Sequence, residues 1–188
     1  MGKIRQEIDD ALAAWIAEQH VFFVATAPSS TAGRVNLSPK GVEGLRVLEG
    51  GEVAWLDLTG SGAETLAHVR ENGRVTLMFC AFEGPPRIVR LYGRGTVVEP
   101  GDPEFPDLRA RFSSTALVRS ILRVRVDRVA DSCGYGVPLM RFEAHRTQLT
   151  DWAERKGPEG LRRYQREKNE KSIDGLPALR FPPLAGGS

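Results

Sequence analysis

Two short stretches of this sequence carry residue types that suit an anionic, planar ligand. In the first, residues 34–41, the alternation of a β-strand separates an apolar face from a polar one. The apolar face holds Val35 and Leu37, and the polar face holds Asn36, Ser38 and Lys40. Short hydrogen-bonding groups that end in one cation suit a flat polar ligand with a phosphate. A strand that faces solvent shows the same pattern, so this assignment is a hypothesis.

The second stretch is the turn 59–62, Thr-Gly-Ser-Gly, which opens an expected helix that ends at Asn72-Gly73. The first backbone N–H groups of a helix lack intrahelical partners and carry partial positive charge, so they suit a phosphate. The alternative is a capping box, in which Ser61 and Glu64 satisfy the same amides and Glu64 repels a dianion. Taken alone, the turn slightly favours the plain cap.

Both stretches need strands to position them. Residues 53–58 and 75–82 have the composition of buried strands and flank the expected helix. The short link Gly84-Pro85-Pro86 joins the second of them to an alternating strand at 87–98, which predicts an antiparallel hairpin. A dinucleotide-binding fold is rejected, because Thr65 stands where its third glycine would be and further βαβ units are missing.

The remaining segments surround this unit. We expect a helix over 4–19, strands at 21–25, 45–48 and 122–126, a short helix within 102–112, a charged helix from Thr147 and a tail over 172–188. The chain therefore divides into a domain over 1–146 and a helical extension with a tail over 147–188. Two glycines flank Tyr135, which either aims this ring at a ligand or a second subunit, or marks an ordinary turn.

Composition excludes several classes of function. The 188 residues include 26 basic and 24 acidic side chains, so the net charge of +2 is no footprint for nucleic acid. Cys80 and Cys133 have no metal-ligand spacing with the three histidines, so no metal site is expected. The longest apolar run, Val21–Ala25, is too short to span a bilayer. We expect a cytoplasmic protein with free thiols.

The order of these parts resembles the FMN-binding split β-barrel of the pyridoxamine 5′-phosphate oxidase family. Four stretches carry the match, at 34–41, 57–62, 72–79 and 90–94. Two more, Ser-Cys-Gly-Tyr-Gly-Val-Pro (132–138) and Ser-Ile-Asp-Gly-Leu-Pro-Ala-Leu (172–179), are similar to an uncharacterised bacterial branch. The resemblance implies an antiparallel six-stranded split barrel with peripheral helices, and a homodimer with FMN at its interface.

The resemblance also assigns residues. It implies that the flavin ring lies beside Val35, Asn36, Leu37 and Ser38, that Lys40 meets the phosphate or the ring edge, and that Leu58, Thr59 and Ser61 close the phosphate side. Arg90 and Tyr135 complete the candidate cofactor set. The family's oxidases carry an Arg-Lys pair after the turn, where this chain has Gly62-Ala63 or Glu64-Thr65. How the phosphate is held is therefore an open question.

Two hypotheses of function follow. The first is an FMN-dependent oxidoreductase that acts on a small molecule other than pyridoxamine phosphate, because the oxidases' C-terminal arginine-rich motif is missing. No catalytic acid or base is identified. The alternative is a non-catalytic protein that binds flavin, F420 or haem on the same fold. A hydrolase is disfavoured because no Gly-x-Ser-x-Gly motif occurs.

Overall fold

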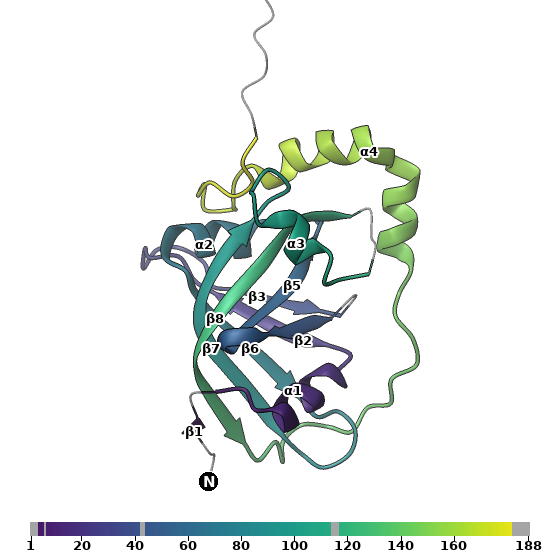
Figure 1. Cartoon of the computed structure of the whole chain (residues 1–188). Coiled ribbons are helices and arrows are strands. Elements are labelled where there is room, and N and C mark those ends of the chain that lie inside the picture. Colours follow the sequence, from purple (N-terminus) through teal and green to yellow (C-terminus); the bar gives the residue numbers. More distant parts are fainter. Residues whose placement is uncertain (1–3, 6, 42–43, 114–116, 182–188) are drawn as a thin grey trace, which may run out of the picture.

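The computed structural model describes residues 4–5, 7–41, 44–113 and 117–181 (Figure 1). Its strands form one antiparallel sheet of eight strands in the order β3-β2-β6-β7-β8-β5-β4, with β1 paired to β8 beside this path. The strands are β1 (Ile4–Arg5), β2 (Phe22–Thr26), β3 (Asn36–Lys40), β4 (Leu45–Leu48), β5 (Glu52–Leu58), β6 (Arg74–Cys80), β7 (Ile88–Val98) and β8 (Val118–Ser132). The sheet curls without closing, which confirms the antiparallel split barrel.

The number of strands differs from the six expected. One of the additional strands is β1, in a segment where the spacing of Ile4 and Ile8 predicted a helix. That helix is shorter than expected: α1 spans Asp10–Ala17, because the side chain of Asp9 caps it by accepting from the backbone N–H of Leu12 at 2.8 Å. The predicted hairpin of β6 and β7 is confirmed.

The core lies inside the curl of the sheet. The ring of Phe22 lies 5.9 Å from that of Trp55 and 5.6 Å from that of Phe79, and all three side chains are buried. Leu12 of α1 and Leu66 of α2 (Glu64–Asn72) belong to the same cluster. The helices α1 and α2 are therefore held to the barrel by their apolar side chains.

The turn before α2 differs from the predicted capping box. Ala63 is the N-cap of this helix, and no side chain caps it. The carboxylate of Glu64 instead accepts a hydrogen bond from the backbone N–H of Ile173 at 3.2 Å. The capping box was wrong because a distant segment takes the carboxylate that would have formed it. The predicted end of the helix is confirmed, since Gly73 adopts φ of 70°.

The C-terminal part returns to the barrel. Two short helices precede it, the 3₁₀-helix η1 (Glu49–Gly51) and α3 (Phe105–Arg109), and α4 (Gln148–Asn169) bends at Gly157. Beyond α4, Ala178 and Leu179 are buried in the main core, and Arg180 pairs with Glu99 and Asp102. The described part of the predicted tail, 172–181, is thus docked, while 182–188 lie outside the described residues. The proposed domain boundary stays a prediction.

Candidate functional site

The polar face of β3 points inward, toward β5 and α2, at the edge where the sheet does not close. This region between β3 and the turn before α2 is called the seam below. Asn36, Ser38 and Lys40 are half-buried, whereas Val35 is 74 % and Leu37 64 % exposed. The predicted alternation is confirmed, but it is the apolar face that meets solvent. Polar groups turn inward because they find partners there, on β5, on β2 and on α2.

The partner of Lys40 is a buried carboxylate. Its Nζ lies 3.7 Å from Oδ1 of Asp57, which is fully buried near the end of β5. Arg119 of β8 donates from Nε to Oδ2 of Asp57 at 2.6 Å, and the hydroxyl of Ser120 donates to the same oxygen at 3.2 Å. Burial alone would raise the pKa of Asp57, but the charges of Arg119 and Lys40 hold it below its usual value. Asp57 is therefore ionised.

This seam cluster, Lys40, Asp57 and Arg119, holds two cations for one carboxylate. The Arg119 side chain is only 5 % exposed, and its Nη1 is buried without a hydrogen-bond partner. The Lys40 side chain is 24 % exposed, and its ion pair with Asp57, at 3.7 Å, is longer than that of Arg119, at 2.6 Å. An excess positive charge in a half-buried position is costly unless an anion compensates it. The seam cluster therefore fits the phosphate of a ligand, with Lys40 as the group free to reach it.

A second network ties β3 to its neighbours. The amide Nδ2 of Asn36 donates to Oγ1 of Thr26 at 3.1 Å and to Oγ1 of Thr65 at 3.0 Å, and Ser38 donates to its Oδ1 at 2.9 Å. Oγ1 of Thr26 also lies 3.0 Å from Nδ1 of His68. Burial lowers the pKa of His68 and keeps the ring neutral. The Asn36 side chain thus fixes β3 against α2, and both of its amide hydrogens are donated in hydrogen bonds. These residues, Asn36, Ser38, Thr26, Thr65 and His68, are called the Asn36 network.

The residues of the turn play different parts. Thr59 is buried, and its hydroxyl donates to the carbonyl of Leu117 at 2.9 Å and accepts from Gln165 at 2.7 Å. Leu58 packs in the second apolar cluster. Ser61 is exposed, so within the turn it is the predicted residue whose side chain is open to a ligand.

Arg90 and Tyr135 lie apart from the seam. Nη1 of Arg90 donates to Oγ of Ser132 at 3.4 Å on the outer face of the sheet, and Tyr135 is 83 % exposed. No contact between described residues joins either of them to the seam cluster. In a single chain, the structure brings together Lys40, Ser38 and Asn36 but not these two.

Sequence reasoning missed Arg119 and the network partners of Asn36. A signal for Arg119 exists, because Arg119-Ser120 interrupts an apolar run that begins at Leu117 and resumes at Ile121. Charged residues that interrupt a buried strand need a partner of opposite sign. Asp57 interrupts β5 in the same way, so the two could have been paired.

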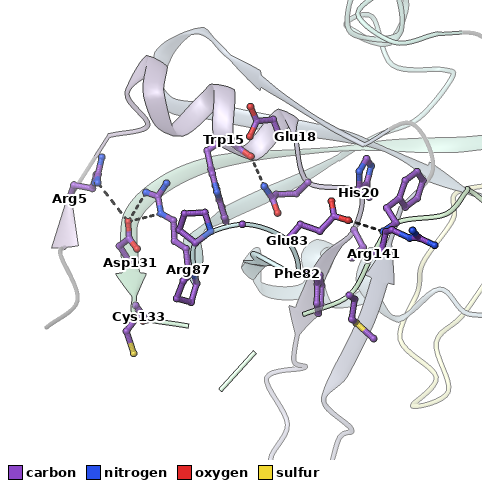
Figure 2. Close-up of a pocket in the computed structure, with 18 residues that line it drawn as sticks. Arg5, Trp15, Glu18, His20, Phe82, Glu83, Arg87, Asp131, Cys133 and Arg141 are labelled. Carbon is purple, nitrogen blue, oxygen red and sulfur yellow. Dashed lines mark hydrogen bonds and ion pairs between the residues drawn. The ribbon is translucent and has the colours of Figure 1, made fainter. Parts of the chain in front are cut away.

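A large cavity lies elsewhere. It has a volume of about 1280 Å³ and lies beside α1, the β6–β7 link and the segment after β8 (Figure 2). None of the ten predicted cofactor residues lines it. No group of His, Cys, Asp and Glu placed to hold a metal ion occurs among the described residues, and none of the helices there is long and apolar enough to cross a bilayer.

Comparison with known proteins identifies relatives. The family model described as pyridoxamine 5′-phosphate oxidase matches residues 8–133. The pyridoxamine 5′-phosphate oxidase family protein ustO of Aspergillus flavus is 39 % identical over 192 residues, which cover 93 % of this chain and 76 % of the relative. This relative is fungal, so the bacterial branch inferred from the sequence stays a prediction.

Solved structures share the fold at low sequence identity. HupZ of Group A Streptococcus superposes with a TM-score of 0.51 and 17 % identity, covering 71 % of this chain and 99 % of HupZ. An FMN-binding protein of Syntrophomonas wolfei gives a TM-score of 0.48 and 15 % identity, covering 66 % of this chain and 82 % of that protein. At these identities, HupZ supports the architecture alone.

Proposed function

Because this chain belongs to the pyridoxamine 5′-phosphate oxidase family, we propose that it binds FMN at the seam between β3 and the turn before α2 and acts as an oxidoreductase. The observation that carries this proposal is the excess positive charge of the seam cluster. A phosphate monoester carries a charge of about −1.5 to −2 at neutral pH. The seam cluster offers it one mobile cation, Lys40, above a buried guanidinium.

Each member of the seam cluster has its own task. Asp57 holds Arg119 in place through a short ion pair. It also attracts Lys40, but Nζ of Lys40 lies 3.7 Å from Oδ1 of Asp57, so this contact does not immobilise the lysine. Lys40 would hold the phosphate of bound FMN, while Arg119 would continue to compensate the charge of the ionised Asp57. The exposed Ser61 would hold other oxygens of that phosphate, together with N–H groups of its turn; that of Thr59 is already used, because it donates to the carbonyl of Leu117. This arrangement replaces the Arg-Lys pair that the chain lacks.

The flavin itself supplies the redox chemistry, the transfer of hydride or electrons between ring and substrate. The protein orients the ring and excludes water from it. Val35 and Leu37 are exposed on the opposite face of β3, an edge strand, so they would provide apolar contacts where the ring extends past this edge. The Asn36 network keeps β3 rigid, so these contacts are preformed.

The site is completed by a second copy of the chain. Cross-strand neighbours share a face of the sheet. One row that runs across the outer face of β3, β2, β6, β7 and β8 consists of Pro39, Phe23, Met78, Arg90 and Ala130. The adjoining row, which begins with Val24 and Leu77, is buried in the core. We propose that a homodimer covers the outer row and the exposed Val35 and Leu37, and brings Arg90 to the cofactor.

The competing proposal keeps the same site for another cofactor, F420 or haem, or for flavin without turnover. F420 carries a phosphate and meets the same cations, whereas a haem needs an axial ligand. His68 is fully buried and contacts Thr26 through Nδ1, whereas the ring of His145 lies beside Gly41, next to Lys40. The excess positive charge of the seam cluster is what supports a phosphate-bearing cofactor. The two free cysteines agree with a cytoplasmic location, which we also propose.

Reconstitution of the purified protein tests the proposal. We expect one FMN per chain, measured by absorbance after gel filtration, and a dimer by light scattering. Bound FMN should then be reduced by NADPH in the absence of oxygen. Binding of F420 or haem with no binding of FMN would contradict the choice of cofactor. Bound FMN that NADPH and other donors fail to reduce would identify a carrier.

A further inference from the structure

The cavity beside α1 shares no lining residue with the seam cluster. It lies where the end of α1 and the β6–β7 link meet the strap, a name used here for residues 133–142 (Figure 2). All of its lining residues are described, and none belongs to the seam cluster or to the Asn36 network. Its volume of about 1280 Å³ exceeds the range of about 300–1000 Å³ typical of small-molecule sites. It has room for a ligand of several rings.

The wall formed by the strap is held in place. The backbone N–H of Met140 donates to the carbonyl of Phe82 at 2.8 Å, and that of Phe142 donates to the carboxylate of Glu83 at 3.1 Å. The ring of Phe142 stacks on His20, with centroids 3.7 Å apart and planes at 14°. A wall fixed by three contacts is preformed, so a ligand does not have to order it on binding.

The other end of the strap is fixed as well. Gly134 adopts φ of 68°, and a Cβ there would lie 2.5 Å from the backbone nitrogen of Arg87. Only glycine combines this conformation with so close an approach. The strap therefore leaves the end of β8 at one defined angle, which keeps Cys133 at the rim of the cavity, as Figure 2 shows.

Four flat side chains contribute to the lining. Trp15, His20, Phe82 and Phe142 contribute aromatic rings, and Val21, Pro85, Pro86 and Met140 add apolar surface. The guanidinium of Arg87 lies 4.7 Å from the centroid of the Trp15 ring and covers one of its faces. Rings in such a setting prefer offset or edge-to-face contact with another ring. The lining is thus built for a planar ring compound.

The charges in the lining balance. It contains three arginines, Arg5, Arg87 and Arg141, and three carboxylates, Glu18, Glu83 and Asp131. Arg87 donates to Asp131 at 2.6 Å, and Arg5 lies 3.8 Å from the same oxygen. Because the lining carries no net charge, a charged ligand would meet no excess of the opposite sign, and it would lose hydration on entry. The balance favours an uncharged ligand.

We propose that this cavity binds an uncharged planar ring compound of two or more fused rings. The cavity shares no residue with the seam cluster, but Ser132 in its lining accepts a hydrogen bond from Arg90, which the proposed homodimer brings to the cofactor. It therefore provides a place for a second molecule next to FMN. The ring lies against Phe142 of the strap and Phe82 of the β6–β7 link.

Calorimetric titration with three matched probes tests the proposal: 2-naphthol (uncharged at pH 7), 2-naphthoate (anionic) and 2-naphthylmethylammonium (cationic). We expect saturable binding of one 2-naphthol per chain and weaker binding of both ions, whether or not FMN is bound. Phe142→Ala should weaken 2-naphthol binding about two- to tenfold, the loss expected for one aromatic contact. Leu139→Ala, on the same strap but outside the lining, should leave it unchanged.

A charge variant keeps the proposal testable if Phe142→Ala fails to fold. Arg141 is exposed, so Arg141→Gln should fold, and it leaves the lining one negative charge in excess. We expect this variant to bind 2-naphthylmethylammonium more tightly than the wild type does. Absence of saturable 2-naphthol binding, tighter binding of 2-naphthoate by the wild type, or equal effects of Phe142→Ala and Leu139→Ala would overturn the proposal.

Discussion

Replacing Asp57 by asparagine should destabilise the protein strongly. The substitution keeps the shape of the side chain but removes the charge that compensates Arg119. Asp57 is fully buried and Arg119 only 5 % exposed, so water cannot take the place of the lost carboxylate. Lys40, which is 24 % exposed, can turn to solvent and contributes little to the loss.

The magnitude follows from this burial. Removing one partner of a buried ion pair costs about 3–5 kcal/mol, whereas a largely solvated pair contributes about 0–1 kcal/mol. For Asp57→Asn we therefore expect a loss of about 3–5 kcal/mol in the free energy of unfolding. With an m-value of about 2–3 kcal/mol/M, the midpoint of urea unfolding falls by about 1–2.5 M.

Urea titration followed by tryptophan fluorescence measures this shift, because Trp55 is buried in the core on β5, the strand that also carries Asp57. Lys40→Gln is the matched control and should lose less than about 1 kcal/mol. The double variant Asp57→Asn/Arg119→Met should recover at least half of the loss, since it removes the uncompensated charge. A loss below about 1 kcal/mol for Asp57→Asn, or an equal loss for Lys40→Gln, would refute this reasoning.

Three further predictions concern other contacts. The pKa of Asp57 is lowered in the folded state, so the stability that this carboxylate contributes is complete above its ordinary pKa of 3.8 and is lost as the pH falls below that value. Acid titration should therefore destabilise the wild type more steeply than Asp57→Asn. Parallel curves of stability against pH for the two proteins would contradict this prediction. Asn36→Ala leaves Thr65 without its partner and should lower stability by about 1–3 kcal/mol and speed hydrogen exchange in β3, whereas unchanged exchange would argue against the network. Cys133 is exposed and Cys80 buried, and burial raises the pKa of Cys80, so one thiol should react rapidly with a disulfide reagent and the second only after unfolding; two fast thiols would contradict the structure.

The sequence predicted the parts of the fold that depend on local patterns. Alternation identified β3, and the short link at Gly84 identified the antiparallel hairpin of β6 and β7. Gly73 ended α2 where expected, because only a local left-handed conformation was required. The resemblance added the order of the parts and hence the split barrel.

The failures come from contacts between distant segments. Glu64 does not form the predicted capping box, because its carboxylate accepts a hydrogen bond from the backbone N–H of Ile173, more than a hundred residues later. The same docking turned the predicted tail into a segment that buries Leu179. Alternation distinguished the two faces of β3 but did not show which one turns inward, since that depends on the position of Thr65 and Asp57.

Titration of the wild type and Lys40→Gln with FMN, and with riboflavin as the analogue without phosphate, tests the central claim most directly. If the seam cluster binds the phosphate, the wild type prefers FMN over riboflavin, and Lys40→Gln weakens FMN binding about 10- to 100-fold, the loss of one charge-assisted hydrogen bond. Riboflavin affinity should stay the same. Equal affinity of both proteins for FMN would contradict the account.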